Sequence, residues 1–324
     1  MQAIRHLLPL PNGSRVEIFL PNDGSDDVAE SIAQGKYTIP PHYRLLESLL
    51  RRPGRVVDLG THLGTFALYA AALGHEVIAV DASERNAAIL RDCCKFNGFD
   101  RVNVIHAAIT DSPGQVEFTE LGPYGVVANP LLNWPTVPVA ATTVDALLAD
   151  FGWPDADFVK MDIEGSEVAA LRGMRRLVSD TQVPIVFESN GHTLHFYDQS
   201  PNMLLRYLEQ ASYATWEVRD HRLVPVASTD LQFECVVDYL ALKGSSHKID
   251  GWRFDARRSE RGQIEMAIAT CRHSNANVRA HAGRMLQFAD ASTLSDIGIQ
   301  TALQDLAKDL DEKVRESVRW FIAR

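Results

Sequence analysis

The stretch VVDLGTHLGTF at residues 56–66 constrains the fold of this chain more than any other segment. An apolar run ends near Asp58, and two glycines follow four positions apart, at Gly60 and Gly64. Glycine tolerates unusual backbone angles and has no side chain, so a strand can turn sharply into a helix while its backbone approaches a ligand. The N–H groups at the start of that helix are free to face the ligand. The stretch therefore predicts a strand, a ligand-binding turn and a helix.

Strand-like and helix-like runs alternate along the chain on both sides of this turn. Strands are predicted over 55–59, 76–80, 102–106, 157–161 and 184–187. Helices are predicted over 63–73, 83–96, 166–177 and 203–210. Such alternation is typical of βαβ units, so we expect an α/β fold with a mainly parallel sheet. Two later strand-like runs at 214–218 and 231–237, with HRLVP at 221–225 as the turn between them, predict an antiparallel edge.

The chain divides by its patterns into a sheet-forming part and a helical part. We expect an N-terminal segment at 1–50 (with a strand at 15–20 and a helix at 43–50), a sheet domain at 51–243, a linker at 244–256 and a helical domain at 257–324. In the helical part, Asn277-Val278-Arg279 recurs as Lys313-Val314-Arg315. Paired helices with such a step resemble HEAT-type repeats, but a small helical bundle explains two copies equally well.

Residues 120–141 interrupt the alternation and hold four prolines. A connection of this length inside a compact domain is often a lid or a binding loop, and the alternative is a poorly ordered surface insertion. Tyr124 and Trp134 within it are candidates either for stacking on a substrate or for anchoring the loop.

The overall composition excludes some classes of protein. A formal net charge of −10 argues against broad binding to nucleic acid. The chain has no run of about 18 apolar residues, so no membrane span is expected. Its N-terminus lacks the features of a secretory signal, and its cysteines show no zinc-binding spacing. We therefore expect a reduced, cytoplasmic protein.

Asp81 favours a ligand that contains adenosine at the glycine turn. It follows the second predicted strand, roughly 20 residues after Gly60, where an acid can accept hydrogen bonds from both ribose hydroxyls. Dinucleotide enzymes use GxGxxG at this turn, whereas this chain reads GTHLGT. His62 in place of the middle glycine would crowd a pyrophosphate. The turn therefore favours S-adenosylmethionine over NAD, and an NAD-linked oxidoreductase stays open as the alternative.

Acids and histidines follow the strands predicted over 157–161 and 184–187. The candidates for catalysis are Asp162, Glu164, Glu188, His192 and His195. Ligands in such sheets lie beyond the carboxyl ends of the strands, where crowded carboxylates have raised pKa values or recruit a cation. A histidine is suited to general-base catalysis near neutral pH, so His192, His195 and Asp162 are the candidate bases. Asp162, Glu188 and Asn190 are oxygen ligands that could instead hold Mg²⁺.

Five segments together resemble the FkbM family of S-adenosylmethionine-dependent methyltransferases. They are VVDLGTHLGTFAL, VIAVDAS, TTVDALL, FVKMDIEGSEVAALRGM and PIVFESNG, in this order. The similarity covers roughly residues 40–242. The resemblance implies a Rossmann-like class I methyltransferase sheet and O-methylation of a hydroxyl on a sugar, a glycolipid or a natural product such as a polyketide. It implies cofactor contacts from Asp58, Gly60, Thr61, His62, Gly64, Asp81, Ala82, Ala107 and Ala108. His62 departs from the asparagine that is common at its position.

The sequence leaves two further functions open. One is a Mg²⁺-dependent O-methyltransferase of the catechol type. The other is an inactive methyltransferase fold that serves as a scaffold, with a helical tail that binds a partner. In either active form the substrate would be a small-molecule, glycan or carrier-bound hydroxyl, and the C-terminal helices would be available for a homodimer or a protein partner.

Overall fold

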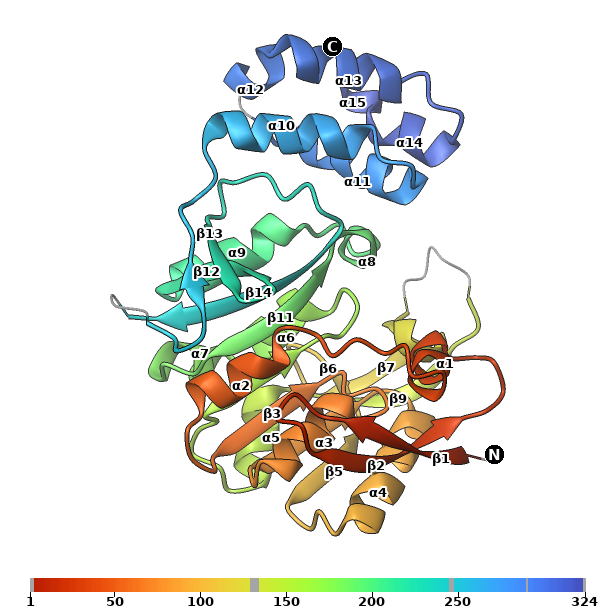
Figure 1. The fold of residues 1–324 in the computed structure, drawn as a ribbon. Coiled ribbons are helices and arrows are strands. Elements are labelled where there is room, and N and C mark those ends of the chain that lie inside the picture. Colours follow the sequence, from red (N-terminus) through yellow and green to blue (C-terminus); the bar gives the residue numbers. More distant parts are fainter. Residues whose placement is uncertain (1–2, 129–133, 245–247, 290, 323–324) are drawn as a thin grey trace.

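The computed structural model describes residues 3–128, 134–244, 248–289 and 291–322. The parallel half of its main sheet consists of β3 (Arg55–Leu59), β4 (Glu76–Asp81), β5 (Val102–His106), β10 (Phe158–Met161) and β11 (Ile185–Asn190). These strands lie in the order β11-β10-β3-β4-β5 (Figure 1). All five were predicted from the sequence, and their carboxyl ends meet along one edge of the sheet.

The other half of the sheet is largely antiparallel, as predicted. It contains β12 (Tyr213–Arg219), β13 (Arg222–Val226), β14 (Val236–Lys243) and β15 (Arg253–Phe254). β14 lies between β11 and β12 and runs antiparallel to both, while β13 pairs with β12 and with β15. Across the described residues the nine strands therefore have the order β15-β13-β12-β14-β11-β10-β3-β4-β5.

Two details of this antiparallel edge were predicted wrongly. The HRLVP segment forms most of β13 rather than a turn, because the reversal occurs earlier, near Asp220, which has a φ of +50°. The strand predicted at 231–237 begins only at Val236. Leu231 and Phe233 instead pack into the hydrophobic core of the helical domain, and not into the core of the main sheet.

Helices cover both faces of the sheet. They are α3 (Thr65–Ala72), α4 (Glu84–Asn97), α5 (Val144–Asp150), α6 (Glu167–Gly173), α7 (Arg175–Asp180) and α9 (Pro201–Gln210). Neighbouring residues of a strand point to opposite faces of the sheet. On β3, Val56 packs in a hydrophobic cluster with side chains of α3 and α4, and Val57 packs in another with side chains of α5, α6 and α9. Ser83 caps α4, and Gly98 ends it in the left-handed conformation.

The helix predicted over 166–177 is divided into α6 and α7. The break lies at Met174, directly after Gly173. A Cβ atom on Gly173 would lie 2.2 Å from the carbonyl oxygen of Thr110, so the chain approaches a neighbouring loop closely at this point. Glycine at position 173 permits this approach, because a larger residue would collide with Thr110.

The N-terminal segment is part of the sheet domain. It contains β1 (Ala3–Pro9), β2 (Arg15–Pro21), α1 (Asp27–Ala33) and α2 (Tyr43–Leu49). The strand at 15–20 and the helix at 43–50 are confirmed, whereas β1 and α1 were not predicted. Ile18 and Leu45 are fully buried in the same cluster as α3 and α4, so this segment packs on one face of the main sheet.

A second sheet occupies the region of the proline-rich connection. Within the described residues its four strands are β6 (Ala108–Ile109), β7 (Gly114–Thr119), β8 (Val126–Val127) and β9 (Val137–Thr142), in the order β6-β9-β7-β8. A short 3-10 helix, η1 (Gly122–Tyr124), connects β7 to β8. The segment predicted as a lid, 120–141, therefore begins directly after β7 and ends within β9. Its residues 129–133 lie outside the described part of the chain.

The C-terminal region is helical, as predicted. It contains α10 (Glu260–Cys271), α11 (Ala276–Leu286), α12 (Ala291–Ser295), α13 (Ile297–Leu306), α14 (Glu312–Ser317) and α15 (Arg319–Ile322). The two copies of the valine-arginine motif lie on α11 and α14, which pack together, and the HEAT-type relationship stays a prediction. The linker at 244–256 includes β15, and its residues 245–247 lie outside the described part.

The helical domain contacts the sheet domain through α8 (Gly191–His195), the short helix that follows β11 (Figure 1). Nε2 of His281 on α11 donates to the backbone carbonyl oxygen of Gln232 at 2.8 Å. The ring lies over Gly191, where a Cβ atom would be 2.2 Å from His281 Cε1. In the part of the chain that the structure describes, no helix is long and apolar enough to cross a membrane.

Candidate functional site

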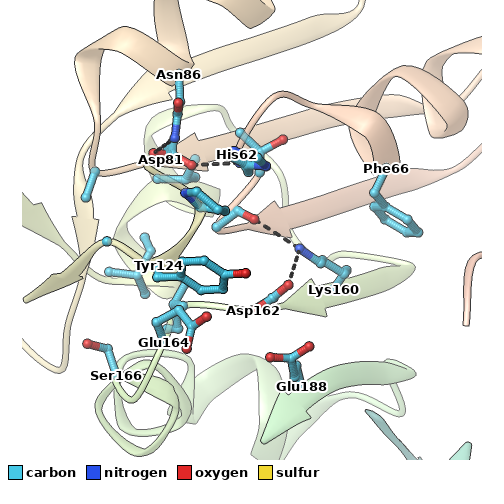
Figure 2. A pocket seen from close by; sticks show the side chains of 18 of the residues that line it. His62, Phe66, Asp81, Asn86, Tyr124, Lys160, Asp162, Glu164, Ser166 and Glu188 are labelled. Atoms are coloured by element: carbon cyan, nitrogen blue, oxygen red, sulfur yellow. Dashed lines mark hydrogen bonds and ion pairs between the residues drawn. The ribbon is translucent and has the colours of Figure 1, made fainter. Parts of the chain in front are cut away.

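A cavity of about 310 Å³ lies at the carboxyl ends of β3, β4, β10 and β11. Its lining includes these residues predicted for the site: Gly60, Thr61, His62, Asp81, Ala82, Ala107, Ala108, Asp162, Glu164 and Glu188. Figure 2 shows His62, Asp81, Asp162, Glu164 and Glu188 around this cavity, on segments that follow separate strands. The main sheet therefore brings together the predicted cofactor turn and the predicted acids.

The glycine turn is required by packing as well as by any ligand. Gly60 has a φ of +72°, and a Cβ atom there would lie 1.7 Å from the carbonyl oxygen of Asp162. Gly64 has a φ of +82° at the start of α3, and its Cβ atom would lie 2.2 Å from Leu90 Cδ1. Asp58 and Gly64 do not line the cavity. They contribute to the site by fixing the conformation of the turn.

Asp81 is held rigidly at the end of β4. Its Oδ2 accepts a hydrogen bond from His62 N at 2.7 Å, and its Oδ1 accepts from Ser83 N at 2.8 Å and from Asn86 Nδ2 at 3.2 Å. Burial raises the pKa of Asp81, and these donors oppose that shift. A carboxylate oxygen accepts about two hydrogen bonds, so Oδ2 retains capacity for a hydroxyl of a ligand.

The N-terminus of α1 contacts the glycine turn beside the cavity. His62 has a φ of +51°, and its Nε2 lies 2.6 Å from Oδ2 of Asp26, the N-cap of α1. Burial would raise the pKa of Asp26, but the hydrogen bond and charge of His62 lower it below its ordinary value. Tyr124 Oη in η1 donates to Asp27 Oδ2 at 2.8 Å. The N-terminal segment and η1 therefore meet beside the predicted cofactor site.

Lys160 is a buried cation that the sequence analysis did not identify. Its Nζ donates to the carbonyl oxygen of Gly60 at 3.0 Å and lies 3.4 Å from Asp162 Oδ2 and 3.5 Å from Asp58 Oδ1. Burial lowers the pKa of Lys160, but Asp162, Asp58 and Glu188 together raise it above its ordinary value. Lys160 is therefore charged and ties β10 to the turn after β3 (Figure 2).

Asp58 is the fully buried partner in this arrangement. Its Oδ2 accepts from Thr61 Oγ1 at 2.7 Å, while its Oδ1 faces Lys160. Burial raises the pKa of Asp58, and the charge of Lys160 opposes this shift. A lysine within the apolar run FVKM was the available sequence signal, but two of its partners, Asp58 and Gly60, come from β3 and the turn after it.

Three carboxylates that line the cavity form an acidic cluster, and one of them, Asp162, also contacts Lys160. Oxygen atoms of Asp162, Glu164 and Glu188 all lie within 4.8 Å of one another. Burial, followed by the charge of Asp162, raises the pKa of Glu164 to about 7. Burial and the charges of Asp162 and Asp238 raise the pKa of Glu188. Such a cluster stabilises a bound cation or holds protons at neutral pH.

Glu164 is positioned by the loop that follows β10. It has a φ of +49°, and its Oε2 accepts a hydrogen bond from Asn190 Nδ2 at 3.1 Å. The next residue, Gly165, has a φ of +99°, and a Cβ atom there would lie 2.6 Å from Tyr197 Cε2. The KMDIEGSE segment thus turns sharply and presents Glu164 to the cavity.

A family model described as "Methyltransferase FkbM domain" matches residues 58–214. The chain carries an FkbM methyltransferase domain. The matched residues contain the glycine turn, Asp81, Lys160 and the three clustered carboxylates. The FkbM domain model leaves out Asp26, His42 and Asp238, although the last two also line the cavity.

Several solved structures are similar to the chain that carries this FkbM domain. One is a methyltransferase FkbM from Methylobacillus flagellatus KT, with 18% identity, 68% of this chain and 56% of that chain covered, and a TM-score of 0.42. An S-adenosylmethionine-dependent methyltransferase from Agrobacterium tumefaciens has 14% identity, 76% and 72% coverage, and a TM-score of 0.41. An O-methyltransferase from Bacillus cereus, in complex with S-adenosylhomocysteine, has 16% identity, 69% and 92% coverage, and a TM-score of 0.37. The chain thus spans little more than half the length of the first structure, and no curated protein matches it significantly.

Two of the predicted catalytic residues of the FkbM domain lie outside the cavity. His192 packs its ring against Phe196, with ring centroids 4.8 Å apart, and His195 lines a separate cleft next to the helical domain. Burial and the charge of Arg284 lower the pKa of both histidines. Both histidines lie on α8, and neither lines the cavity that contains Glu164.

His42 and Asp238 add a pair that was not predicted. His42 Nδ1 lies 2.9 Å from Asp238 Oδ2, and both residues line the cavity of the FkbM domain. Asp238 is directly opposite Glu188 in the pairing of β11 with β14. Burial would raise the pKa of Asp238, but His42 lowers it. Nothing local in the sequence connects residue 42 with residue 238, so only the fold could place them together.

Proposed function

We propose that this chain is an S-adenosylmethionine-dependent O-methyltransferase that acts on a hydroxyl of a sugar, a glycolipid or a natural product. The proposal rests on one observation above all. An acid-lined cavity lies where the strands of an FkbM domain end, and Asp81 is fixed at its edge. The methyl acceptor class follows from the family resemblance rather than from the geometry.

The residues of the cavity fit S-adenosylmethionine better than a dinucleotide. Asp81 retains an acceptor for a ribose hydroxyl, and Ala107, Ala108 and Phe118 provide apolar surface suited to an adenine ring. The cluster of Asp162, Glu164 and Glu188 favours a ligand that carries positive charge, and S-adenosylmethionine has a sulfonium and an ammonium group. The same carboxylates would repel the pyrophosphate of NAD.

Glu164 is the base that we favour for the acceptor hydroxyl. When bound, S-adenosylmethionine supplies an activated methyl group, so the acceptor oxygen needs only alignment and the loss of its proton. Glu164 lines the cavity, and its pKa of about 7 leaves a substantial fraction of the carboxylate ionised at neutral pH. Its hydrogen bond from Asn190 fixes the orientation of the carboxylate that receives the proton. A base placed in this way typically contributes about 10²–10⁴-fold to the rate.

Mg²⁺ is a second candidate for activating the hydroxyl, because the three clustered carboxylates are the hard oxygen ligands that it prefers. Lys160 already neutralises part of their charge, which weakens this alternative. The two mechanisms differ in whether methyl transfer depends on the metal.

Calorimetric titration of the protein with S-adenosylmethionine, S-adenosylhomocysteine and NAD, each with and without Mg²⁺, tests the proposal. We expect saturable binding of the two sulfur nucleotides and none of NAD. A screen of sugar and polyketide hydroxyls with labelled S-adenosylmethionine then identifies the acceptor. Binding of NAD alone would point to an oxidoreductase, and binding of none of the three would favour an inactive scaffold.

A further inference from the structure

The cavity of the FkbM domain extends along the main sheet beyond the part that we assign to the cofactor. In the order of the strands, its lining includes Asp81 on β4, Gly60 after β3, Asp162 after β10 and Glu188 on β11. Figure 2 shows Asp162 between Asp81 and Glu188. A cofactor whose ribose binds Asp81 therefore leaves the part near β11 for the methyl acceptor. We call this part the acceptor end, and its lining includes Tyr37, Pro40, His42, Asp162, Glu188 and Asp238.

The N-terminal segment forms one wall of the acceptor end. The hydroxyl oxygens of Tyr37 and Tyr43 lie 3.5 and 2.6 Å from Thr65 Oγ1, at the start of α3. His42 Nδ1 lies 2.9 Å from Asp238 Oδ2 on β14. Because β10 and β11 lie between β3 and β14 in the sheet, the connection from Tyr37 to Tyr43 spans the ends of both strands. Tyr37 is half-buried and lines the cavity, so a ligand can reach it.

Glu188 carries a carboxyl group without a polar partner at the acceptor end. Asp162 is paired with Lys160, and Asp238 is paired with His42. The carboxyl of Glu188, in contrast, makes no hydrogen bond or ion pair with any described residue. Glu188 is half-buried and lines the cavity, so a ligand can reach this group. A carboxyl group accepts hydrogen bonds in either protonation state, which suits it to a hydroxyl of the acceptor.

The spacing of Glu164 and Glu188 suits two neighbouring hydroxyl groups. Their carboxylate oxygens lie within 4.8 Å of each other. An acceptor hydroxyl that loses its proton to Glu164 also places the next carbon of its ring beside Glu188. Two hydrogen bonds of about 2.7 Å, one from each of two neighbouring hydroxyls, can bridge this separation. The pair of carboxyl groups therefore favours an acceptor with hydroxyls on adjacent carbons.

The charges of the acceptor end select against an anion. Lys160 is the one lysine or arginine among the described residues that line the cavity, and it already faces Asp58 and Asp162. An acceptor with its own carboxylate or phosphate would be repelled by Asp162 and Asp238. The ring of Tyr37 offers apolar surface, which suits the face of an uncharged sugar ring.

We propose that Glu188 and Tyr37 select the acceptor, which is a neutral sugar with hydroxyl groups on adjacent carbons. One of the two hydroxyls is methylated, and the other donates a hydrogen bond to Glu188. The face of the sugar ring packs against Tyr37, and Glu188 takes no part in the transfer itself. The inference rests on the proposed methyl transfer and specifies which groups the acceptor must carry.

The charge of the acceptor is tested with four methyl glycosides and labelled S-adenosylmethionine. They are the glycosides of glucose, galactose, mannose and glucuronic acid. We expect the best neutral glycoside to exceed the glucuronide by at least about tenfold in kcat/KM. Preference for the glucuronide, or transfer to none of the four by a protein that binds S-adenosylhomocysteine, would overturn the inference. A protein that does not bind S-adenosylhomocysteine would overturn the proposed function, and this inference with it.

The neighbouring hydroxyl is tested with deoxy analogues of the best glycoside, each lacking one hydroxyl next to the methylated position. With the unmodified protein, one analogue should lose about 10- to 100-fold in kcat/KM. Glu188→Leu should lower kcat/KM for the parent glycoside by a similar factor, but should change it little for that analogue. Glu188→Ala replaces Glu188→Leu if the latter no longer binds S-adenosylhomocysteine. Additive losses, or no loss with any deoxy analogue, would exclude the proposed contact with Glu188.

The role of Tyr37 is tested by comparing the acceptor KM with cofactor affinity. Tyr37→Ala should raise the KM of the best glycoside by about threefold to tenfold, whereas Tyr37→Phe keeps the ring and should restore it. Thr38→Ala, at an exposed neighbour outside the cavity lining, is the matched control. All three variants should bind S-adenosylhomocysteine as the unmodified protein does. An unchanged KM in Tyr37→Ala, or an equal loss of cofactor affinity, would overturn the assignment of Tyr37 to the acceptor.

Discussion

His62 Nε2 lies 2.6 Å from Asp26 Oδ2, and this contact joins the turn after β3 to the N-terminus of α1. His62 is also the residue whose backbone N–H donates to Asp81. His62 therefore links the N-terminal segment to Asp81, the carboxylate that we propose to bind the ribose hydroxyls. The N-terminal segment should accordingly affect cofactor affinity even though it lies outside the matched FkbM domain.

Asp26→Asn tests this connection. Asparagine keeps an acceptor for the N-cap of α1 but removes the charge opposite His62, so the turn should lose part of its restraint. We expect the affinity for S-adenosylhomocysteine to fall by about threefold to tenfold in a calorimetric titration. Asp23→Asn is the control, because it removes an exposed ion pair with Arg85 from the same segment. Equal losses in the two variants would contradict a specific role for Asp26.

Asp81→Ala should weaken cofactor binding more strongly. The change removes the acceptor proposed for the ribose and leaves the N–H of His62 without its partner. We expect at least a tenfold to hundredfold loss of affinity for S-adenosylmethionine, measured by calorimetry. Asp92→Ala on the exposed side of α4 should bind as the unmodified protein does. Retained affinity in Asp81→Ala would remove this residue from the cofactor site.

Glu164→Gln tests the assignment of the base. A base must be ionised, so the rate of methyl transfer should rise with pH through about 7, the pKa of Glu164. In Glu164→Gln, kcat should fall by about 10²-fold, and this rise with pH should disappear. Glu117→Gln on β7, outside the cavity lining, should keep both the rate and the profile. An unchanged pH profile in Glu164→Gln would assign the base to another residue.

Glu167 should make stability depend on pH. Burial raises the pKa of Glu167 to about 8, well above the value of about 4.3 for an exposed glutamate. The folded state therefore keeps a proton that the unfolded state releases, so stability is lost as pH rises from about 4 to about 8. Glu167→Gln keeps the acceptor for Gly165 N and should stabilise the protein by on the order of 1–3 kcal/mol at pH 8.5.

The check is urea unfolding of both proteins at pH 5 and pH 8.5. At pH 5 Glu167 is protonated when folded, so Glu167→Gln should have a much smaller effect there. A stabilisation of equal size at both values would show that the raised pKa of Glu167 is not its cause.

Lys160→Met should be strongly destabilising. The change leaves Asp58, which is fully buried, without the cation that faces it. Removing one member of a buried charge pair typically costs about 3–5 kcal/mol, measured by urea unfolding. The double variant Asp58→Asn with Lys160→Met removes both charges and should recover most of this loss. If the double variant is as unstable as Lys160→Met, then the charge pair does not explain the effect.

The parallel half of the fold could be predicted because its signals are local. The apolar runs, the caps Ser83 and Gly98, and the acids at strand ends all lie within one or two elements of the residues they organise. The cofactor turn and Asp81 were found together for the same reason. Their meeting in one cavity follows from the rule that ligands lie at the carboxyl ends of parallel strands.

The parts that could not be predicted depend on distant contacts. Phe233 is apolar because it packs into the helical domain, which made the segment before β14 look like a strand. Lys160 is tolerated in an apolar strand only because Asp58 and Asp162 surround it. His192 closely follows β11 in sequence, but it lies on α8 outside the cavity, where burial and the charge of Arg284 on the helical domain lower its pKa.

The position of β14 also means that the main sheet can be completed only late in synthesis of the chain. β14 is inserted between β11 and β12, and it carries Asp238 to a place opposite Glu188. Until residue 243 has left the ribosome, β11 remains an unpaired edge, and such edges are prone to pair with other chains. A nascent chain that stalls after the last residue of the FkbM match, at 214, would therefore expose this edge, and it is at this stage that a chaperone would be most needed.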